Sequence, residues 1–139
     1  MLNVDLFRIM NIELEIKVIN TFIVKEKQAR YIEFISSNRT RKKFIDKLPH
    51  FRDLQWDLFE EITNDDEILN RLKSLKSHIK DCYIISEDIK IDQKIFPVQE
   101  AIKTIGGYRD NATILVFGNA ELVYFEGEPP QNRYISKIK

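Results

Sequence analysis

Apolar residues change their spacing along this chain near its middle. Over residues 12–77 they recur every three or four positions, which is the spacing of one face of an α-helix. From Cys82 onward, short runs such as 112–117 carry apolar residues at consecutive or alternate positions, which is typical of β-strands. The pattern therefore predicts a helical first half and a sheet built from the second half.

The helices of the first half are separated by turn residues, caps and one proline. Residues 12–23 fit both periods, but a helix is favoured because no Gly, Pro or turn signal separates them from the next helix. Pro49 ends the third helix, and Asn64 or Asp65 caps the fourth. We expect helices at residues 12–23, 24–36, 38–48 and 65–77, an extended lead-in or disordered tail at 1–10, and an irregular or 3₁₀ turn with a short helix over 51–59.

The second half contains a hairpin signal and several β-rich runs. Gly118-Asn119 separates two of these runs, and both residues tolerate the positive φ that a tight hairpin turn needs. We expect strands at 82–86, 112–117, 121–125 and 133–138, and a short helix at 98–105 that ends at Gly106-Gly107. The predicted fold class is α+β, with the helical N-terminal half packed on one face of a mostly antiparallel sheet of about four strands. A parallel pair is an option for the first strand, because a helix follows it.

Length and composition fit a single domain over residues 1–139. The chain is 43% hydrophobic and 32% charged, which is an ordinary globular profile and far from that of a disordered chain. Cys82 is the single cysteine, so an intrachain disulfide is excluded and a reducing compartment is the simplest interpretation. No signal-like segment opens the chain, and no apolar run approaches the roughly 20 residues that cross a bilayer. We therefore expect a cytoplasmic protein with no membrane partner.

The charges balance overall but are unevenly distributed. The chain has 22 basic and 22 acidic side chains. The segment Lys25–Arg52 holds nine basic and three acidic residues, whereas Asp53–Glu67 holds seven acidic residues and no basic one. Two adjacent blocks of opposite sign are expected to fold near each other and to neutralise each other in part.

The basic block contains a candidate phosphate-binding surface. Arg39, Lys43 and Lys47 are spaced at i, i+4 and i+8, so a helix over 38–48 would place them on one face, with Arg52 following. Such a face can track a nucleic-acid backbone. The zero net charge favours the alternative of a solvated or internally paired face.

Aromatic residues gather in the predicted sheet. Alternation places Tyr124 on the face opposite Phe125 and Val123, so some rings must lie on the side away from the helices. An uncovered aromatic face supports dimerisation or partner binding, and Tyr124 and Tyr134 are the candidate residues. The alternative is that loops or the N-terminal segment cover that face. The aromatic residues concerned are Tyr83, Tyr108, Phe117, Tyr124, Phe125 and Tyr134.

The sequence offers few candidates for catalysis or metal binding. Cys82 lies four positions after His78, but a cysteine that opens a buried strand is usually a core residue. Two acidic groups flank the predicted sheet, and solvated loop charges are favoured over a metal or acid–base site. No metal or cofactor is expected. The two groups are Glu87, Asp88 and Asp92 after the first strand, and Glu121, Glu126 and Glu128 around the hairpin.

These features favour a non-enzymatic protein–protein interaction domain from the bacterial cytoplasm. It would bind a protein partner or form a homodimer through the sheet, and an immunity or antitoxin-like role is compatible with this. Two alternatives stay open. One is nucleic-acid binding through the basic helix Arg39–Arg52, and the other is a small enzyme that uses carboxylates of the Glu121–Glu128 hairpin.

Overall fold

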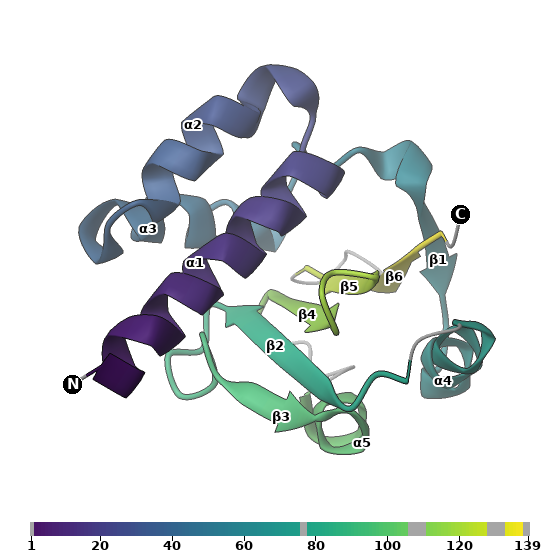
Figure 1. Cartoon of the computed structure of the whole chain (residues 1–139). Helices are drawn as coiled ribbons and strands as arrows, with labels where there is room; N and C mark the ends of the chain where they lie inside the picture. The colour runs from purple at the N-terminus through teal and green to yellow at the C-terminus, as the bar shows by residue number, and fades with distance from the viewer. Residues whose placement is uncertain (1, 76–77, 106–110, 128–132, 138–139) are drawn as a thin grey trace.

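The computed structural model of the chain describes residues 2–75, 78–105, 111–127 and 133–137 (Figure 1). Helices come first and most of the strands come last, as the spacing of apolar residues predicts. The elements are α1 (Leu2–Phe22), α2 (Lys25–Ile35), α3 (Asn38–Ile45), β1 (Phe59–Ile62), α4 (Asp65–Ser74), β2 (Asp81–Ser86), β3 (Ile95–Pro97), α5 (Val98–Glu100), β4 (Thr113–Phe117), β5 (Leu122–Glu126) and β6 (Arg133–Ser136). Two 3₁₀ turns (Leu48–His50 and Trp56–Leu58) lie between α3 and β1, and a π-helical turn (Ala101–Ile105) continues α5.

The sheet has six strands in the order β1-β6-β5-β4-β2-β3, and every neighbouring pair is antiparallel. The α+β class and the antiparallel sheet are thus confirmed, with two strands more than predicted. A parallel pair at β2 is wrong, because residues 87–94 turn the chain back and β3 pairs with β2 in the antiparallel direction. The short helix predicted within 51–59 is also wrong. That segment contains a 3₁₀ turn and then enters β1, whose only buried residues are the terminal Phe59 and Ile62.

Helix α1 is longer than predicted. Residues 12–23 are helical almost to their end, and the helix extends back to Leu2 in place of the extended or disordered lead-in. The segment contains no Gly or Pro that would interrupt it, and the capping residue Asn11 lies within the helix and does not start it. At its other end, Ile23 forms an isolated bridge with Leu54, and the Val24 amide donates to the Asp53 carbonyl at 2.8 Å. These contacts tie the end of α1 to the segment that precedes β1.

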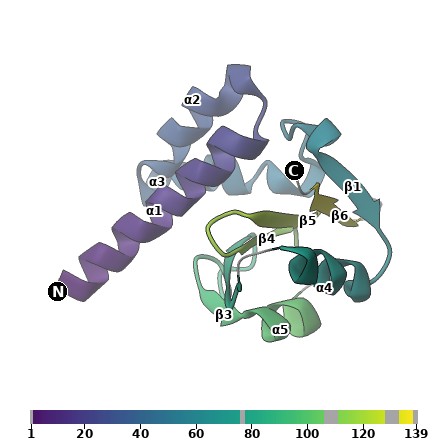
Figure 2. The ribbon, with the colours of Figure 1, turned by 45° about the vertical axis from the view of Figure 1, so that its right-hand side comes forward.

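Helices cover both faces of the sheet. Alternate strand residues such as Tyr83, Ile85 and Phe125 pack with α1, α2 and α3, which confirms that the N-terminal helices lie on one face. The residues between them, such as Ile84 and Tyr124, pack with α4 and the α5 turn. Figure 2 shows the sheet between these two helical layers. The second face, for which no helical cover was predicted, is therefore covered by α4 and α5.

Local signals in the sequence explain two of the connections. The Asn64 side chain accepts a hydrogen bond from the Glu67 amide, and the Glu67 side chain accepts one from the Asn64 amide, so a capping box starts α4. The predicted hairpin at Gly118-Asn119 joins β4 to β5. Gly118 has a φ of +61°, and a Cβ there would lie 2.8 Å from the Glu121 Oε1 atom.

Candidate functional site

Arg41 leaves the basic surface and enters a buried network. Its Nε and one terminal nitrogen donate to the two Glu15 carboxylate oxygens at 3.0 and 2.8 Å, and its terminal nitrogens donate to Asp92 at 2.5 and 3.0 Å. The Tyr83 hydroxyl also donates to Glu15, at 2.6 Å. Arg41 is only 6% exposed. The network therefore joins α1, α3, β2 and the turn after β2, and it engages Asp92, which was a candidate for metal or acid–base chemistry.

The electrostatics of this network favour fixed charges over proton transfer. Burial by itself lowers the pKa of Arg41, but the hydrogen bonds that it donates to the Glu15 and Asp92 carboxylates more than compensate, so its pKa is raised. Burial raises the pKa of Tyr83, and the adjacent Glu15 charge raises it further. Arg41 therefore stays charged and Tyr83 stays neutral at physiological pH, and together they hold the Glu15 carboxylate in place.

A second buried network holds Tyr124, one of the predicted binding residues. Its hydroxyl donates to Glu126 at 3.0 Å and accepts from the Arg133 Nε at 2.6 Å. Arg133 also donates to Asp65 at the start of α4, at 2.5 Å. Tyr124 is fully buried, so its ring belongs to the core under α4.

Within the described residues, neither face of the sheet presents the uncovered aromatic surface that the sequence predicted. Tyr124 lies on the face opposite Val123 and Phe125, as alternation predicts, but that face is covered. Tyr134 lies on the other face and is half-buried, with its ring centroid 4.9 Å from that of Trp56. Tyr108 lies outside the described residues. The observation that motivated a dimer through the sheet face is therefore removed.

The predicted basic helix face is only partly formed. Arg39, Lys43, Lys47 and Arg52 are all exposed. Helix α3 ends at Ile45, however, so Lys47 lies in the turn beyond the helix and the spacing of i to i+8 on one helical face does not apply. Lys47 and Arg52 instead line a hollow at the end of this turn.

The basic and acidic blocks mostly lie apart, which corrects the prediction that they neutralise each other. In the described ranges the acidic block pairs elsewhere, Glu60 with Arg71 and Asp65 with Arg133. The cause is the position of β1 and α4, which carry the acidic residues to the opposite edge of the sheet from α2 and α3 (Figure 1). Asp53, the first acidic residue of the block, lies beside the basic residues.

The remaining candidates for chemistry do not converge. Cys82 is completely buried in β2, and burial raises the pKa of its thiol, as expected of a core residue. Glu121 lies exposed at the β4–β5 turn, whereas Glu126 is buried at the far end of β5. Glu128 lies outside the described residues. Among the residues that the structure does describe, no group of three or more His, Cys, Asp or Glu side chains is placed to hold a metal ion.

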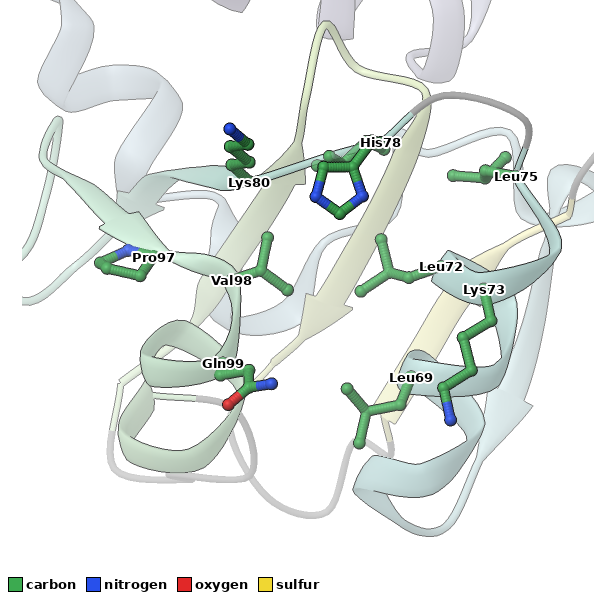
Figure 3. Close-up of a pocket in the computed structure, with 10 residues that line it drawn as sticks. Leu69, Leu72, Lys73, Leu75, His78, Lys80, Pro97, Val98 and Gln99 are labelled. Atoms are coloured by element: carbon green, nitrogen blue, oxygen red, sulfur yellow. The ribbon is translucent and has the colours of Figure 1, made fainter.

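An apolar groove lies on the second face, between α4 and the end of β3 with α5 (Figure 3). Its volume is about 560 Å³. Leu72 and Val98 project into it from opposite sides, and the segment that leads into β2 crosses one end with His78. The lining residues are Leu69, Leu72, Lys73, Leu75, His78, Ile79, Lys80, Pro97, Val98 and Gln99.

The groove exists because α4 and α5 cover the second face without closing over it. Leu69, Leu72 and Val98 pack on the core beneath, yet each stays partly exposed. Leu75, which directly follows α4, is also only partly buried, whereas Ile68 on α4 is completely buried. The sequence pattern marks this stripe as the buried side of a helix, and it carries no signal that its outer part would stay open.

Among the described residues that line the groove, the ionisable ones are all Lys or His. Lys73, His78 and Lys80 are exposed at its rim, and no acidic side chain is found in this described lining. None of the ion pairs found within the described ranges involves either lysine. The groove thus combines apolar walls with a positive rim.

Comparison of the chain with models of protein families, with curated proteins and with solved structures gives no significant match. Within the described parts of the chain, no helix is both long enough and apolar enough to span a bilayer. The functional argument therefore depends on the geometry and chemistry of the groove itself.

Proposed function

We propose that this protein is a non-enzymatic interaction domain that binds an acidic, amphipathic segment of another protein in the groove between α4 and α5. The observation that carries the proposal is the combination of an apolar floor, made of partly exposed Leu and Val side chains, with a rim whose described residues include lysines and no carboxylate. Apolar side chains of the partner would fill the floor, and its carboxylates would lie against Lys73 and Lys80.

The size of the groove favours a short segment over a flat domain surface. A groove of about 560 Å³ has the volume of a pocket that encloses one small ligand, about 300–1,000 Å³. It therefore accepts a few side chains from one helix or one extended strand. The partner is therefore expected to present a helix or a terminal segment.

The energetics favour transient binding. Five apolar residues that are partly but less than half exposed line the groove, namely Leu69, Leu72, Leu75, Ile79 and Val98. Covering the exposed part of each contributes about 0.5 kcal/mol at the usual value per unit of apolar area. Their total of about 2–3 kcal/mol falls well short of the roughly 8 kcal/mol of micromolar binding, even before the cost of association. The lysine rim must therefore supply much of the affinity and the specificity.

Two features of the sheet edges argue for a partner other than a second copy of this chain. Glu60 and Glu61 occupy the middle of edge strand β1, so an antiparallel pair of two such strands would place like charges together. The other edge strand, β3, has three residues and ends at Pro97, which has no amide hydrogen to donate. Both edges are thus poor templates for self-association.

A cytoplasmic site of action is part of the proposal. Cys82 is free and buried, and the fold is held together without any disulfide. This is the arrangement expected where thiols stay reduced.

Charge reversal at the rim tests the proposal without disturbing the core. The probe is a short fluorescent peptide with leucines on one face of a helix and glutamates on the other, and its binding is followed by anisotropy. Lys73→Glu with Lys80→Glu should abolish binding, because both residues are exposed at the rim. The matched control is Lys90→Glu with Lys94→Glu, which makes the same charge change at exposed positions of the β2–β3 connection and should leave binding unchanged.

Three outcomes would overturn the proposal. The first is equal binding of a peptide in which lysines replace the glutamates, and the second is unchanged binding by the rim variant. The third is a dimer, seen by light scattering, that Leu72→Glu converts to a monomer, since that would place a second copy in the groove.

A further inference from the structure

The turn after α3 forms a hollow that gathers basic side chains from two parts of the chain. Its volume is about 350 Å³. Lys27 comes from the first turn of α2, and Lys47, His50 and Arg52 come from the turn and the 3₁₀ segment that follow α3. The full lining is Lys27, Asp46, Lys47, Pro49, His50, Phe51, Arg52 and Asp53.

The hollow is rigidly supported. Phe51 is 2% exposed, and its ring contacts those of Tyr31 and Phe125, with centroids 5.8 and 6.1 Å apart. The Val24 amide donates to the Asp53 carbonyl at 2.8 Å, which fixes the turn to the start of α2. The basic side chains therefore extend from a backbone that is already ordered, and little ordering is left for a ligand to impose.

The charge of the hollow is positive on balance. Three Lys or Arg side chains and His50 line it, against two aspartates. The Asp53 carboxylate already accepts a hydrogen bond from the Tyr31 hydroxyl at 2.5 Å. No ion pair within the described ranges involves Lys27, Lys47 or Arg52. These cations are available to a ligand of negative charge.

A second pair of cations lies next to the hollow. Arg30 follows Lys27 by one turn of α2, and Lys43 precedes Lys47 by four residues. Their charged groups lie 5.5 and 5.9 Å from the centre of the Phe34 ring, so one aromatic ring holds a cation from each of two helices. None of the ion pairs within the described ranges involves Arg30 or Lys43.

We infer that the hollow binds a phosphate group and that Arg30 with Lys43 binds a second one, so that the ligand carries at least two linked phosphates. Lysine and arginine are the usual partners of phosphate oxygens in proteins. Two sources share this chemistry, a small polyphosphate and a single-stranded nucleic acid, and the test below distinguishes them. This site is on the opposite side of the sheet from the groove and does not depend on it.

The test measures binding of pyrophosphate by calorimetry and of a fluorescent single-stranded oligonucleotide by anisotropy, each over a range of salt concentrations. Lys47→Glu with Arg52→Glu should abolish pyrophosphate binding. For the oligonucleotide, loss of two phosphate contacts should reduce the slope of log K against log salt by about 1.4, since each contact contributes about 0.7 for a single strand. Binding of pyrophosphate alone identifies a small polyphosphate, and binding of the oligonucleotide, with or without pyrophosphate, identifies a strand.

The matched controls are Lys90→Glu with Lys94→Glu and Lys73→Glu with Lys80→Glu, which change the net charge equally at other exposed positions. Both controls should bind as the parent protein does. The inference is overturned if neither probe binds the parent protein, or if the Lys47→Glu, Arg52→Glu variant and the controls weaken binding equally. The groove and the hollow share no lining residue. Failure of phosphate binding at the hollow would therefore leave the proposed interaction function of the groove untouched.

Discussion

Arg41→Ala is the substitution that most directly tests what holds the two halves of the molecule together. Arg41 and Glu15 are 6% and 1% exposed, and the guanidinium is shared between Glu15 and Asp92. Truncation leaves the Glu15 carboxylate buried with the Tyr83 hydroxyl as its remaining hydrogen-bond donor among the described residues. An uncompensated charge would then lie between α1 and β2.

The expected loss of stability is large. Removal of one partner from a buried ion pair costs about 3–5 kcal/mol, because the remaining charge stays desolvated. Glu15 should dominate this cost, since Asp92 is 15% exposed in its side chain and also accepts from the Ser86 amide at 3.0 Å. A domain of this size is typically stable by about 5–15 kcal/mol, so the variant is expected to lose roughly a fifth or more of its stability.

Urea unfolding measures this effect, with circular dichroism and the fluorescence of Trp56 as probes. Arg39→Ala is the control, because Arg39 is exposed on the same helix and its truncation should change the free energy of unfolding by no more than about 0.5 kcal/mol. Combining Arg41→Ala with Glu15→Ala should restore part of the stability, because the second change removes the orphaned charge. A loss below about 1 kcal/mol for Arg41→Ala, or a double variant no more stable than Arg41→Ala alone, would refute the reasoning.

Two further predictions concern alkaline pH and the β4–β5 turn. Burial raises the pKa of Tyr83 and Tyr124 above their ordinary value of 10.0. Above pH 10.0 both hydroxyls therefore keep their protons in the folded state and lose them in the unfolded state. The contribution of these two residues to the free energy of unfolding should be intact below that pH and should fall above it by about 2.7 kcal/mol per pH unit. Urea midpoints measured on both sides of that pH check this, and a flat profile would contradict it. Gly118→Ala places a side chain at a φ of +61° and should destabilise the protein by about 1–2 kcal/mol. Thermal unfolding measures this, and an unchanged midpoint would show that the turn relaxes freely.

Local patterns in the sequence were sufficient for the second half of α1, for α2, α3 and α4, for the β4–β5 hairpin and for the two faces of β5. Gly118-Asn119 specifies its turn through backbone conformations that few residues adopt, and this information lies within the turn itself. The same holds for Tyr124 and Val123, whose opposite faces follow from the pleat of a strand. Such features need no knowledge of distant residues.

Features that depend on distant partners could not be predicted from local patterns. Arg41 looks like one more member of a basic run, and only its partners, 26 and 51 positions away, draw it into the interior. Strand β1 carries apolar residues only at its two ends, and its strand conformation depends on pairing with β6 near the end of the chain. Neither feature leaves a periodic signal in the sequence.

The two candidate sites escaped prediction for the same reason. The groove depends on how far apart α4 and α5 lie over the sheet, and the pattern of each helix carries no information about that spacing. The basic hollow depends on the end of α3 at Ile45, which turns the chain so that Lys47 and Arg52 meet Lys27. Lys47 and Arg52 of the hollow were among the predicted binding residues, whereas no residue of the groove was. In both cases the arrangement came from the tertiary structure.

The central claim is that the groove between α4 and α5 is the binding surface, and methyl NMR tests it most directly. The labelled protein would be titrated with the acidic amphipathic peptide while the methyl signals of Ile, Leu and Val are followed. The claim predicts that Leu69, Leu72 and Val98 shift with one common saturation curve and that Ile89, exposed on the β2–β3 connection, does not. Shifts spread evenly over the surface, or confined to residues of α2 and α3, would contradict it.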